Sequence, residues 1–549
     1  MEHIMGRRLR IYYTSDTHSH LYPTRYADHT PSPMGMLACA QEFDIDAETL
    51  VFDNGDTLQG SAFGYYCATK LHSPAPIAQA FIECGYHVAT AGNHDFNYGW
   101  RYLADYVTQL RKGGAAFVCQ NITDAAGKAL FPPVVLTTGN GVKVGVAGAV
   151  TDWVNVWEQP ENLVGIKVSD PFEALRQAAD ELRGRCDIMV CLYHGGYERD
   201  TATGAVVSKT NENVGYRICE ELDFDLLLCG HQHNPTPGRL VQGTFTIQPG
   251  EYGRQYCHLE LVEHGSAELA AGRRWEVSLS ELVTPRSGIS GLSAPEPWVL
   301  AAPDAPTSSN IVANPRVASV ARALLPLEND LQNWLDKPVG QLSYALKPDT
   351  RERMAANGSP IADFVNQVQL AATGAEVAVS SLANEIAGFN TTVTTRDILA
   401  TYPYANTLLT LQLTGAELKA AIERSAEYLT LDAAGNLAVS AAFLVPKIEH
   451  YSYDFFAGID YAFDISLPPG KRVTRLARWD GTPIAPDDHI RICLNNYRAS
   501  GAGEYPMYVG KHPLAEITVS MSELLLEYFA THSDIELKRL RPERLAYGF

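Results

Sequence analysis

The chain has 549 residues, which is more than one hydrophobic core usually supports, so at least two domains are expected. Its 46% hydrophobic and 19% charged residues are typical of a globular protein and exclude a disordered or fibrous chain. A formal net charge of −20 argues against nucleic-acid polymers and anionic membranes as partners, because its field repels polyanions. A small anion can still bind where divalent cations or arginines reverse the local potential.

The ten cysteines are scattered singly, without a CxxC pair, which predicts buried free thiols in a reducing compartment. Residues 1–10 lead almost directly into an apolar strand, with no hydrophobic signal region or small-residue cleavage site. We therefore expect a cytoplasmic protein, or an exported one if a leader has been removed. The sequence contains no apolar run of about 18 residues and therefore predicts no membrane span. The protein is expected to be a monomer or a homodimer without a membrane partner.

The first half of the chain repeats one pattern, in which a short apolar run precedes a polar cluster rich in Asp, His, Asn and Gly. The apolar runs predict strands at Leu9–Tyr13, Leu50–Phe52, His87–Thr90, Ile188–Leu192 and Leu226–Cys229. Amphipathic helices are predicted between them at Pro76–Glu83, Tyr102–Arg111 and Pro171–Leu182. This order indicates a layered α/β domain, in which ligands bind at the carboxyl ends of the strands. All five polar clusters follow such an end.

The polar clusters carry side chains that bind metal ions, namely Asp16, His18, Asp56, Asn93, His194, His231 and His233. Carboxylate, imidazole and amide ligands together favour Mn, Zn, Co or Fe over Ca or Mg. Seven ligands exceed what one ion needs. If one carboxylate bridges, with Asp56 the first choice, two ions fit about 3.5–4 Å apart and generate an activated hydroxide. His94, oriented by Asp95, would then assist the leaving oxygen by a hydrogen bond or a proton.

Each of these motifs has a simpler explanation when it is taken alone. Asp-x-His and Gly-Asp are common in turns and helix caps, and one histidine of Gly230–His233 could be a satisfied core residue. Metal-type residues at five separate strand ends are not explained in that way. Their coincidence favours a metal site.

The second half of the chain predicts a separate domain. A Ser-, Ala-, Pro- and Gly-rich stretch from about Pro285 to Pro315 indicates a linker, and a helix is expected next at Val317–Leu335. An α+β domain is predicted from a helix and four strands, at Ile361–Leu370, Val377–Ser381, Leu408–Leu413, Tyr461–Ile465 and Ile490–Asn495. Thr414 and Glu417 fit a capping box at the start of another helix. The expected divisions are 1–286, a linker and connecting helix at 287–338, and 339–549.

The motifs of the first half resemble the calcineurin-like metallophosphoesterase family in kind and in order: Asp16-x-His18, Gly55-Asp56, Gly92-Asn93-His94-Asp95, His194 and Gly230-His231-x-His233. The resemblance implies a layered metallophosphoesterase β-sandwich with flanking helices. It implies one metal held by Asp16, His18, Asp56 and His233. It implies a second metal held by Asp56, Asn93, His194 and His231. His94 and Asp95 match the catalytic dyad of the family.

Nearly the whole chain resembles bacterial bifunctional nucleotidases, namely the 5′-nucleotidase/UDP-sugar hydrolases and the 2′,3′-cyclic-nucleotide 2′-phosphodiesterase/3′-nucleotidases. Three segments resemble the cyclic-phosphodiesterase branch most, at Tyr402–Thr407, Gly458–Asp464 and Asn495–Pro506. The resemblance implies a 5′-nucleotidase C-terminal-like domain that binds the nucleotide, with Tyr404 stacked on the base. Either Tyr505 or Tyr497 would supply a second stacking ring.

Residues 380–389 lack the arginine of the Asn-Gly-Gly-Ile-Arg-type segment found in many 5′-nucleotidases. Asn384 and Arg351 are further candidate contacts to the nucleotide. We expect metal-dependent hydrolysis of nucleotide phosphate esters, either as a 2′,3′-cyclic nucleotide phosphodiesterase/3′-nucleotidase or as a 5′-nucleotidase. A UDP-sugar or dinucleotide pyrophosphatase is the alternative within the same chemistry. A non-catalytic nucleotide-binding protein is the alternative from another class.

Overall fold

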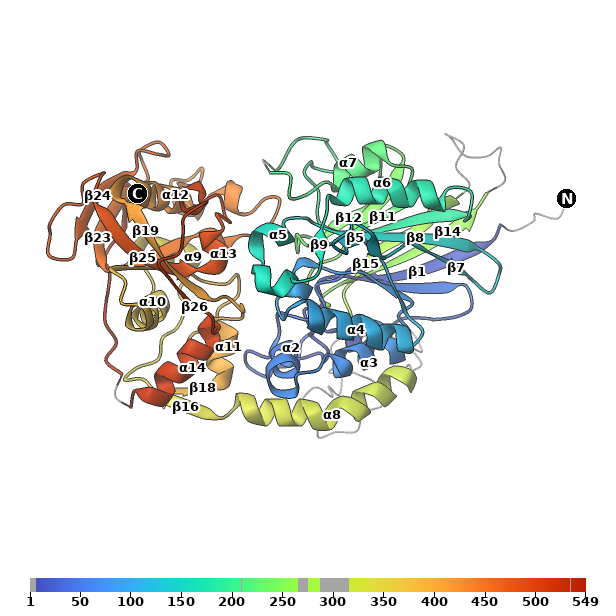
Figure 1. Ribbon diagram of the computed structural model, residues 1–549, viewed down its shortest axis with the longest axis horizontal. Coiled ribbons are helices and arrows are strands. Elements are labelled where there is room, and N and C mark those ends of the chain that lie inside the picture. Colours follow the sequence, from blue (N-terminus) through green and yellow to red (C-terminus); the bar gives the residue numbers. More distant parts are fainter. Residues whose placement is uncertain (1–5, 209, 265–274, 287–314, 534) are drawn as a thin grey trace. The chain divides into compact units, whose positions relative to one another are not determined.

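The computed structural model describes residues 6–208, 210–264, 275–286, 315–533 and 535–549 (Figure 1). The chain divides into two compact units, Met1–Leu331 and Gln332–Phe549. Helix α8 (Pro315–Leu335) runs across this division. The predicted linker lies almost entirely outside the described residues, so the domain limits 1–286, 287–338 and 339–549 stay a prediction.

Two six-stranded sheets form the centre of the first unit, with strand orders β15-β14-β1-β2-β3-β4 and β12-β13-β11-β10-β8-β7. Their strands are β1 (Arg8–Thr14), β2 (Thr49–Asp53), β3 (Val88–Ala89), β4 (Ala116–Phe117), β7 (Val134–Thr137), β8 (Lys143–Val150), β10 (Ile188–His194), β11 (Leu226–Cys229), β12 (Thr236–Val241), β13 (Thr244–Gln248), β14 (Tyr256–Glu263) and β15 (Trp275–Val283). β1, β2 and β3 run parallel, as do β8, β10 and β11. The carboxyl ends of each set therefore meet at one edge of their sheet.

Helices cover the outer faces of the two sheets, so the first unit is a four-layered sandwich (Figure 1). α3 (Ala75–Glu83) and α4 (Trp100–Lys112) lie on one side, and α6 (Pro171–Leu182) and α7 (Gly215–Glu221) on the other. Apolar side chains from both sheets fill the space between them, including Ile11, Phe52, Val146, Val190 and Leu228. The predicted layered α/β sandwich is confirmed, and its strands read as continuous apolar runs because they are buried on both faces.

Shorter elements of the first unit lie mainly in its connections. They are α1 (Met36–Gln41), α2 (Ala62–Tyr66), the π-helix η1 (Cys67–Leu71), η2 (Asn93–Phe96), α5 (Val154–Trp157), η3 (Pro160–Leu163) and the small sheet of β5 (Cys119–Thr123), β6 (Ala129–Phe131) and β9 (Lys167–Val168). Two of these, η2 and α5, carry residues that belong to the site described below.

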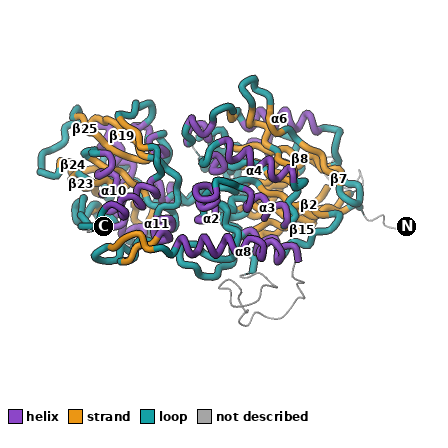
Figure 2. Tube along the Cα trace, turned by 60° about the horizontal axis from the view of Figure 1, so that its bottom comes forward, coloured by secondary structure: helices purple, strands orange, loops and turns teal. Residues whose placement is uncertain are grey.

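The second unit is built on a five-stranded sheet of order β22-β17-β25-β19-β26, which Figure 2 shows among helices. Its strands are β17 (Val377–Ser381), β19 (Leu408–Thr414), β22 (Asp454–Ala457), β25 (His489–Asn495) and β26 (Ala515–Ile517). A three-stranded sheet joins β23 (Ile459–Asp464), β24 (Val473–Arg478) and β27 (Ala546–Tyr547), and two short ribbons pair β16 (Pro338–Gln341) with β18 (Thr392–Thr394) and β20 (Leu429–Leu431) with β21 (Leu437–Val439). The predicted α+β character is confirmed.

The helices of the second unit are α9 (Arg351–Asn357), α10 (Pro360–Thr373), α11 (Thr395–Thr401), α12 (Gly415–Ala426), α13 (Asn496–Ala499) and α14 (Met521–Thr531), with 3-10 turns η5 (Ala441–Phe443), η6 (His450–Ser452) and η7 (Pro506–Tyr508). The predicted capping box opens α12, because the Thr414 hydroxyl accepts the Glu417 N–H and the Glu417 carboxylate accepts the Thr414 N–H. Two orphan N–H groups of the first turn are thereby satisfied.

All ten cysteines are unpaired, and all except the half-buried Cys186 are buried. This confirms the prediction of buried free thiols. Among the helices of the described residues, none combines the length and the apolar character that crossing a bilayer requires.

Candidate metal centre

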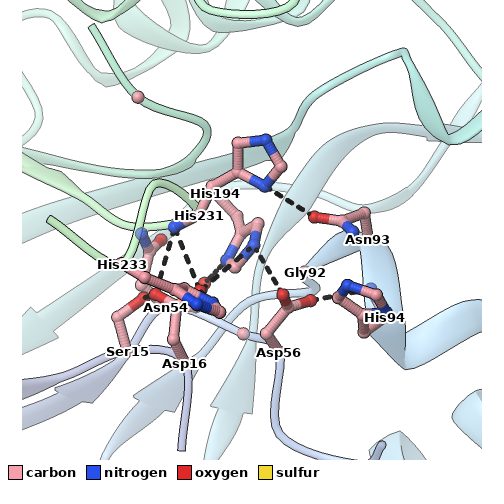
Figure 3. Close-up of polar contacts among 12 residues, drawn as sticks. Ser15, Asp16, Asn54, Asp56, Gly92, Asn93, His94, His194, His231 and His233 are labelled. Atoms are coloured by element: carbon pink, nitrogen blue, oxygen red, sulfur yellow. Dashed lines mark hydrogen bonds and ion pairs between the residues drawn. The ribbon is translucent and has the colours of Figure 1, made fainter. Parts of the chain in front are cut away.

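The seven predicted metal ligands all follow or end a strand of the first unit. Asp16 and His18 come after β1, Asp56 after β2, and Asn93 opens η2 just beyond β3. From the other sheet, His194 ends β10, and His231 and His233 follow β11. Figure 3 labels Asp16, Asp56, Asn93, His194, His231 and His233, which converge from both sheets on one small region. The convergence expected from the strand ends is therefore present.

One group of four forms a tight cluster. A ligand atom of each of Asp16, His18, Asp56 and His233 lies within 4.8 Å of the others. Nε2 of His18 and Nε2 of His233 are 3.1 Å apart, and Nε2 of His233 lies 3.2 Å from Oδ1 of Asp16. Two imidazole nitrogens and two carboxylates at this spacing match the ligand preferences of a borderline divalent cation.

Asp56 stands between this cluster and the remaining ligands. Its Oδ2 atom is 3.8 Å from Nε2 of His18 and 3.3 Å from Nε2 of His194. Its Oδ1 atom accepts the backbone N–H of His94 at 2.7 Å, which fixes the carboxylate. Among the remaining ligands, Nδ1 of His231 and Oδ1 of Asn93 lie 2.8 Å apart. One carboxylate oxygen thus faces a histidine of each implied metal set.

Backbone and side-chain oxygens fix which nitrogen three of the histidines present. Nδ1–H of His18 donates to the Gln59 carbonyl at 2.6 Å, and Nδ1–H of His194 donates to the Asn54 carbonyl at 2.5 Å. A carbonyl only accepts, so Nδ1 of each ring carries a proton and Nε2 is the nitrogen directed to the cluster. His231 is turned the other way, because its Nε2 meets Oε1 of Glu212 at 2.6 Å and its Nδ1 faces Asn93.

The loops that carry the ligands are strained. Five ligands have left-handed backbone, namely Asp16 (φ 54°), His18 (φ 48°), Asp56 (φ 53°), His231 (φ 75°) and His233 (φ 55°). Such conformations cost about 1–3 kcal/mol each for residues other than glycine and concentrate at functional sites. Gly92 allows the close approach, because a Cβ there would lie 2.2 Å from Oδ1 of Asp56. The backbone conformations that place the ligands therefore lower the stability of the fold.

The cluster has the negative charge and the buried ligand atoms that a cation requires. Oδ2 of Asp56 and Nε2 of His194 are buried and have no hydrogen-bond partner. Burial raises the pKa of Asp56, but the facing His194 outweighs it and holds that pKa well below the usual range. Burial lowers the pKa of His194, whereas Asp56 and Asp16 raise it to about 9. Two buried carboxylates therefore need positive charge beside them, and the residues present fit divalent cations.

His94 is half-buried next to Asp56 (Figure 3), and its ring centroid lies 5.5 Å from that of His18. The prediction that Asp95 orients His94 is wrong. The buried Asp95 carboxylate accepts backbone N–H groups of Asp56, Thr57, Leu58 and Gly92 and so shapes the loops. Nδ1 of His94 instead lies 2.8 Å from Oδ1 of Asn97, the residue that directly follows η2. Local spacing favours i+3 over i+1 for side chains on one face of such a turn.

The candidate base-binding residues lie in the second unit. Tyr404 and Tyr497 are half-buried and both contact Tyr451, with ring centroids 6.4 Å apart in each pair. Tyr505 has no exposed surface, and its hydroxyl contacts Ser425 at 2.8 Å and the Ser452 carbonyl at 3.0 Å. A ring without exposed surface has no face for a ligand, so the alternative that assigns stacking to Tyr505 is wrong. Tyr497 is the half-exposed ring of the two.

The other two predicted contacts of the second unit hold loops together. Arg351 donates to the carbonyls of Ala383 and Asn384 at 2.7 and 2.5 Å. The Asn384 amide in turn donates to the Ile448 carbonyl at 2.8 Å and accepts the His450 N–H at 3.0 Å. Both residues therefore position the segment that leads into Tyr451, and their contact with a nucleotide stays a prediction.

Sequence reasoning missed several residues around the metal centre. Glu212 binds His231, Asn97 binds His94, and the Trp157 ring stacks on His231 with centroids 5.6 Å apart at 24°. In the second unit it missed Tyr451 and the role of buried Arg498, which donates to the Tyr451 carbonyl at 2.6 Å. Asn97 was the one with a local signal, because it lies three residues after His94. The others come from distant loops, where no spacing rule applies.

Two family models match the chain. Residues 9–235 match the calcineurin-like phosphoesterase model, and residues 338–510 match the model of the 5′-nucleotidase C-terminal domain. These ranges contain all the candidate residues named above. The first covers the strand ends that hold the metal ligands, and the second covers the tyrosines.

Similar proteins span the chain. The 2′,3′-cyclic-nucleotide 2′-phosphodiesterase/3′-nucleotidase of Salmonella typhimurium is 26% identical over 90% of this chain and 81% of its own. The trifunctional nucleotide phosphoesterase YfkN of Bacillus subtilis is 24% identical over 97% of this chain, which corresponds to 38% of that longer protein. A solved structure from Staphylococcus aureus, described as a candidate 5′-nucleotidase, has a TM-score of 0.84 and 29% identity, with 98% of this chain and 100% of the other covered.

Proposed function

Because the chain belongs to the calcineurin-like phosphoesterases that carry a 5′-nucleotidase C-terminal domain, a family of nucleotide phosphoesterases, we propose that it hydrolyses nucleotide phosphate esters with two divalent cations. The position of Asp56 carries the proposal, since its Oδ2 faces His18 at 3.8 Å and His194 at 3.3 Å. The first cation is assigned to Asp16, His18, Asp56 and His233. The second is assigned to Asp56, Asn93, His194 and His231.

Bound cations of this kind supply a hydroxide at neutral pH and polarise the phosphoryl oxygens. The chain contributes His94, whose Nδ1–H donates to Asn97 and whose Nε2 is therefore the nitrogen left for the substrate. From Nε2 a proton passes to the oxygen of the leaving ribose as its bond to phosphorus breaks. The buried positions of Asp16 and Asp56 keep bulk water from screening these charges.

The preferred substrates are proposed to be 2′,3′-cyclic nucleotides and nucleoside 3′-phosphates. The segments around Tyr404 and Tyr497 support this choice, together with the similarity to the Salmonella phosphodiesterase/3′-nucleotidase over most of both chains. In the second unit, the half-exposed rings of Tyr404 and Tyr497 would stack on the base, and stacking tolerates any base because each has a π-face. Nucleoside 5′-phosphates are the second candidate, favoured by the Staphylococcus aureus structure.

A substrate panel tests the proposal. Purified protein is assayed on 2′,3′-cyclic AMP, 3′-AMP, 5′-AMP and UDP-glucose, with Mn²⁺, Co²⁺, Zn²⁺ or Fe²⁺ added after chelation. We expect the highest kcat/KM for ring opening of 2′,3′-cyclic AMP to 3′-AMP and for phosphate release from 3′-AMP, and neither reaction in chelator. A higher kcat/KM for UDP-glucose would favour a pyrophosphatase. Tight nucleotide binding without hydrolysis under every metal would overturn the enzyme assignment.

A further inference from the structure

A chain of three polar side chains leads away from the metal centre through His94. Nδ1 of His94 meets Oδ1 of Asn97 at 2.8 Å, and Nδ2 of Asn97 donates to Oε2 of Glu158 at 2.7 Å. Glu158 caps the end of α5, far from His94 in the sequence but joined to it here by one amide. None of the metal ligands takes part in this series of side-chain hydrogen bonds.

The Glu158 carboxylate is held firmly at the end of the chain. Its other oxygen, Oε1, accepts the Gln159 backbone N–H at 2.8 Å and the Asn162 side-chain amide at 2.8 Å. Together with Asn97, three donors therefore point at one carboxylate. Since an ionised carboxylate only accepts hydrogen bonds, the NH₂ group of Asn97 must face Glu158. Its carbonyl oxygen must then face His94, whichever way the amide would turn on its own.

We propose that Glu158 is a positioning residue for His94, acting through the amide of Asn97, in the hydrolysis proposed above. The amide oxygen can only accept, so it requires a proton on Nδ1 of His94. This keeps Nε2 as the atom that exchanges a proton with the substrate. The carboxylate thus selects the tautomer of a catalytic histidine without touching it.

The proton balance of the step follows from this arrangement. As hydroxide oxygen bonds to phosphorus, the bond between phosphorus and the ribose oxygen breaks, and that oxygen takes the proton of Nε2. The imidazole that remains is neutral, with its proton on Nδ1 and its hydrogen bond to Asn97 unchanged. Water returns a proton to Nε2 before the next turnover. A flipped Asn97 amide would instead place N–H opposite Nδ1 and leave the Nδ1 proton without its acceptor.

A purely structural role for Glu158 would be to tie its loop to η2. That tie also exists without its carboxylate, because the Asn162 amide donates to the Asn97 backbone carbonyl at 3.2 Å. The two roles can therefore be distinguished by variants that reverse the direction of the side-chain hydrogen bonds but keep the shapes of the side chains. Exchanging amide and carboxylate between positions 97 and 158 does this.

The experiment compares Glu158→Gln, Asn97→Asp and the double variant with wild-type protein, each reconstituted with Mn²⁺ and assayed on 3′-AMP. In Glu158→Gln, the new amide oxygen must satisfy Gln159 and Asn162, so its NH₂ faces Asn97 and turns that amide around. We expect kcat to fall roughly 10- to 100-fold, as for other outer-shell partners, with KM within about twofold. Asn97→Asp alone sets two carboxylates against each other, and kcat should also fall.

The double variant should recover kcat to within a few-fold of wild type, because the new amide at position 158 then donates to the new carboxylate at position 97, which accepts from His94. Glu161→Gln, an exposed neighbour on the same loop, is the matched control and should keep wild-type kcat. The losses should shrink with 4-nitrophenyl phosphate, whose leaving group needs little protonation. The proposal is overturned if Glu158→Gln keeps the wild-type kcat. It is also overturned if the kcat of the double variant is no higher than the value obtained by multiplying the losses of the two single variants. Inactive wild-type protein on all nucleotides would instead overturn the proposed function.

Discussion

The metal centre of the first unit and the tyrosine cluster of the second unit hold their residues in different ways. The metal ligands stand at the ends of β1, β2, β3, β10 and β11, in strained backbone next to a rigid core. Tyr404 lies on a loop, Tyr451 in η6 and Tyr497 in α13, and Arg498, Arg351 and Asn384 hold the neighbouring segments by side-chain hydrogen bonds. We propose that the first arrangement fixes ligand atoms for chemistry and that the second fixes flat rings for base recognition. Changes in the first should therefore act on metal content and kcat, and changes in the second on KM.

The largest effect is expected for Asp56→Asn. Loss of the bridging charge should weaken both cation sites, and activity should fall by more than the roughly 100-fold that outer-shell changes cost. Metal content by plasma mass spectrometry and kcat/KM on 3′-AMP check this. A variant that retains two equivalents of metal and the wild-type rate would show that Asp56 does not bridge two cations.

His94→Asn should leave metal content unchanged while kcat falls about 10²- to 10⁴-fold, the range that proton transfer by a side chain contributes. The KM for nucleotides should change little, because the ring acts in the transition state. Steady-state kinetics with metal analysis of the same sample measure both. An unchanged kcat would remove His94 from the mechanism.

Glu212→Ala tests whether His231 depends on its carboxylate. Without the 2.6 Å contact to Nε2, the ring is free to turn its proton toward Asn93, and metal affinity should fall roughly 10- to 100-fold. Competition with a metal indicator gives the affinity, and the exposed Glu220→Ala on the same segment is the control. Equal affinities for the two variants would count against this role.

Much of the first unit could be predicted from the sequence. Polar residues directly after apolar strands have little use in a core, so Asp16, Asp56 and His194 stood out against their surroundings. Asp95 did not, because a carboxylate next to His94 suits a catalytic partner as well as it suits a loop anchor. The contacts of Glu212 and Glu158 depend on tertiary structure, which brings together residues 19 and 61 positions apart.

The candidate nucleotide-binding residues of the second unit were harder to predict, because their residue types are common in a core. The chain has 27 tyrosines, and most aromatic rings serve a core. Tyr505 and Tyr497 lie eight residues apart in one resembling segment, yet one is buried and the other half-exposed. Burial of a single ring depends on the packing around it. Strand and helix positions, including the capping box of α12, followed local rules and were predicted well.

Tyr497→Ala and Tyr505→Phe test separately the half-exposed and the buried tyrosine of the second unit. Tyr497→Ala should raise KM for 3′-AMP roughly 10-fold, because a base–aromatic stack contributes about 1–3 kcal/mol. It should spare 4-nitrophenyl phosphate, which has no base. A nucleotide KM that does not move would remove Tyr497 from binding.

Tyr505→Phe should show the smallest effect. KM should stay at the wild-type value, while the free energy of unfolding falls by about 1 kcal/mol through the lost hydroxyl contacts to Ser425 and Ser452. Thermal or urea unfolding measures this. A raised KM with unchanged stability would return Tyr505 to the binding site.

The proposed function requires Asp56 to lie between two cations at the strand ends of the first unit. Anomalous diffraction at the manganese edge, from crystals of the full chain grown with Mn²⁺, tests it most directly. We expect two anomalous peaks about 3.5–4 Å apart, on either side of the Asp56 carboxylate. One peak, or peaks away from Asp56 and His194, would contradict it.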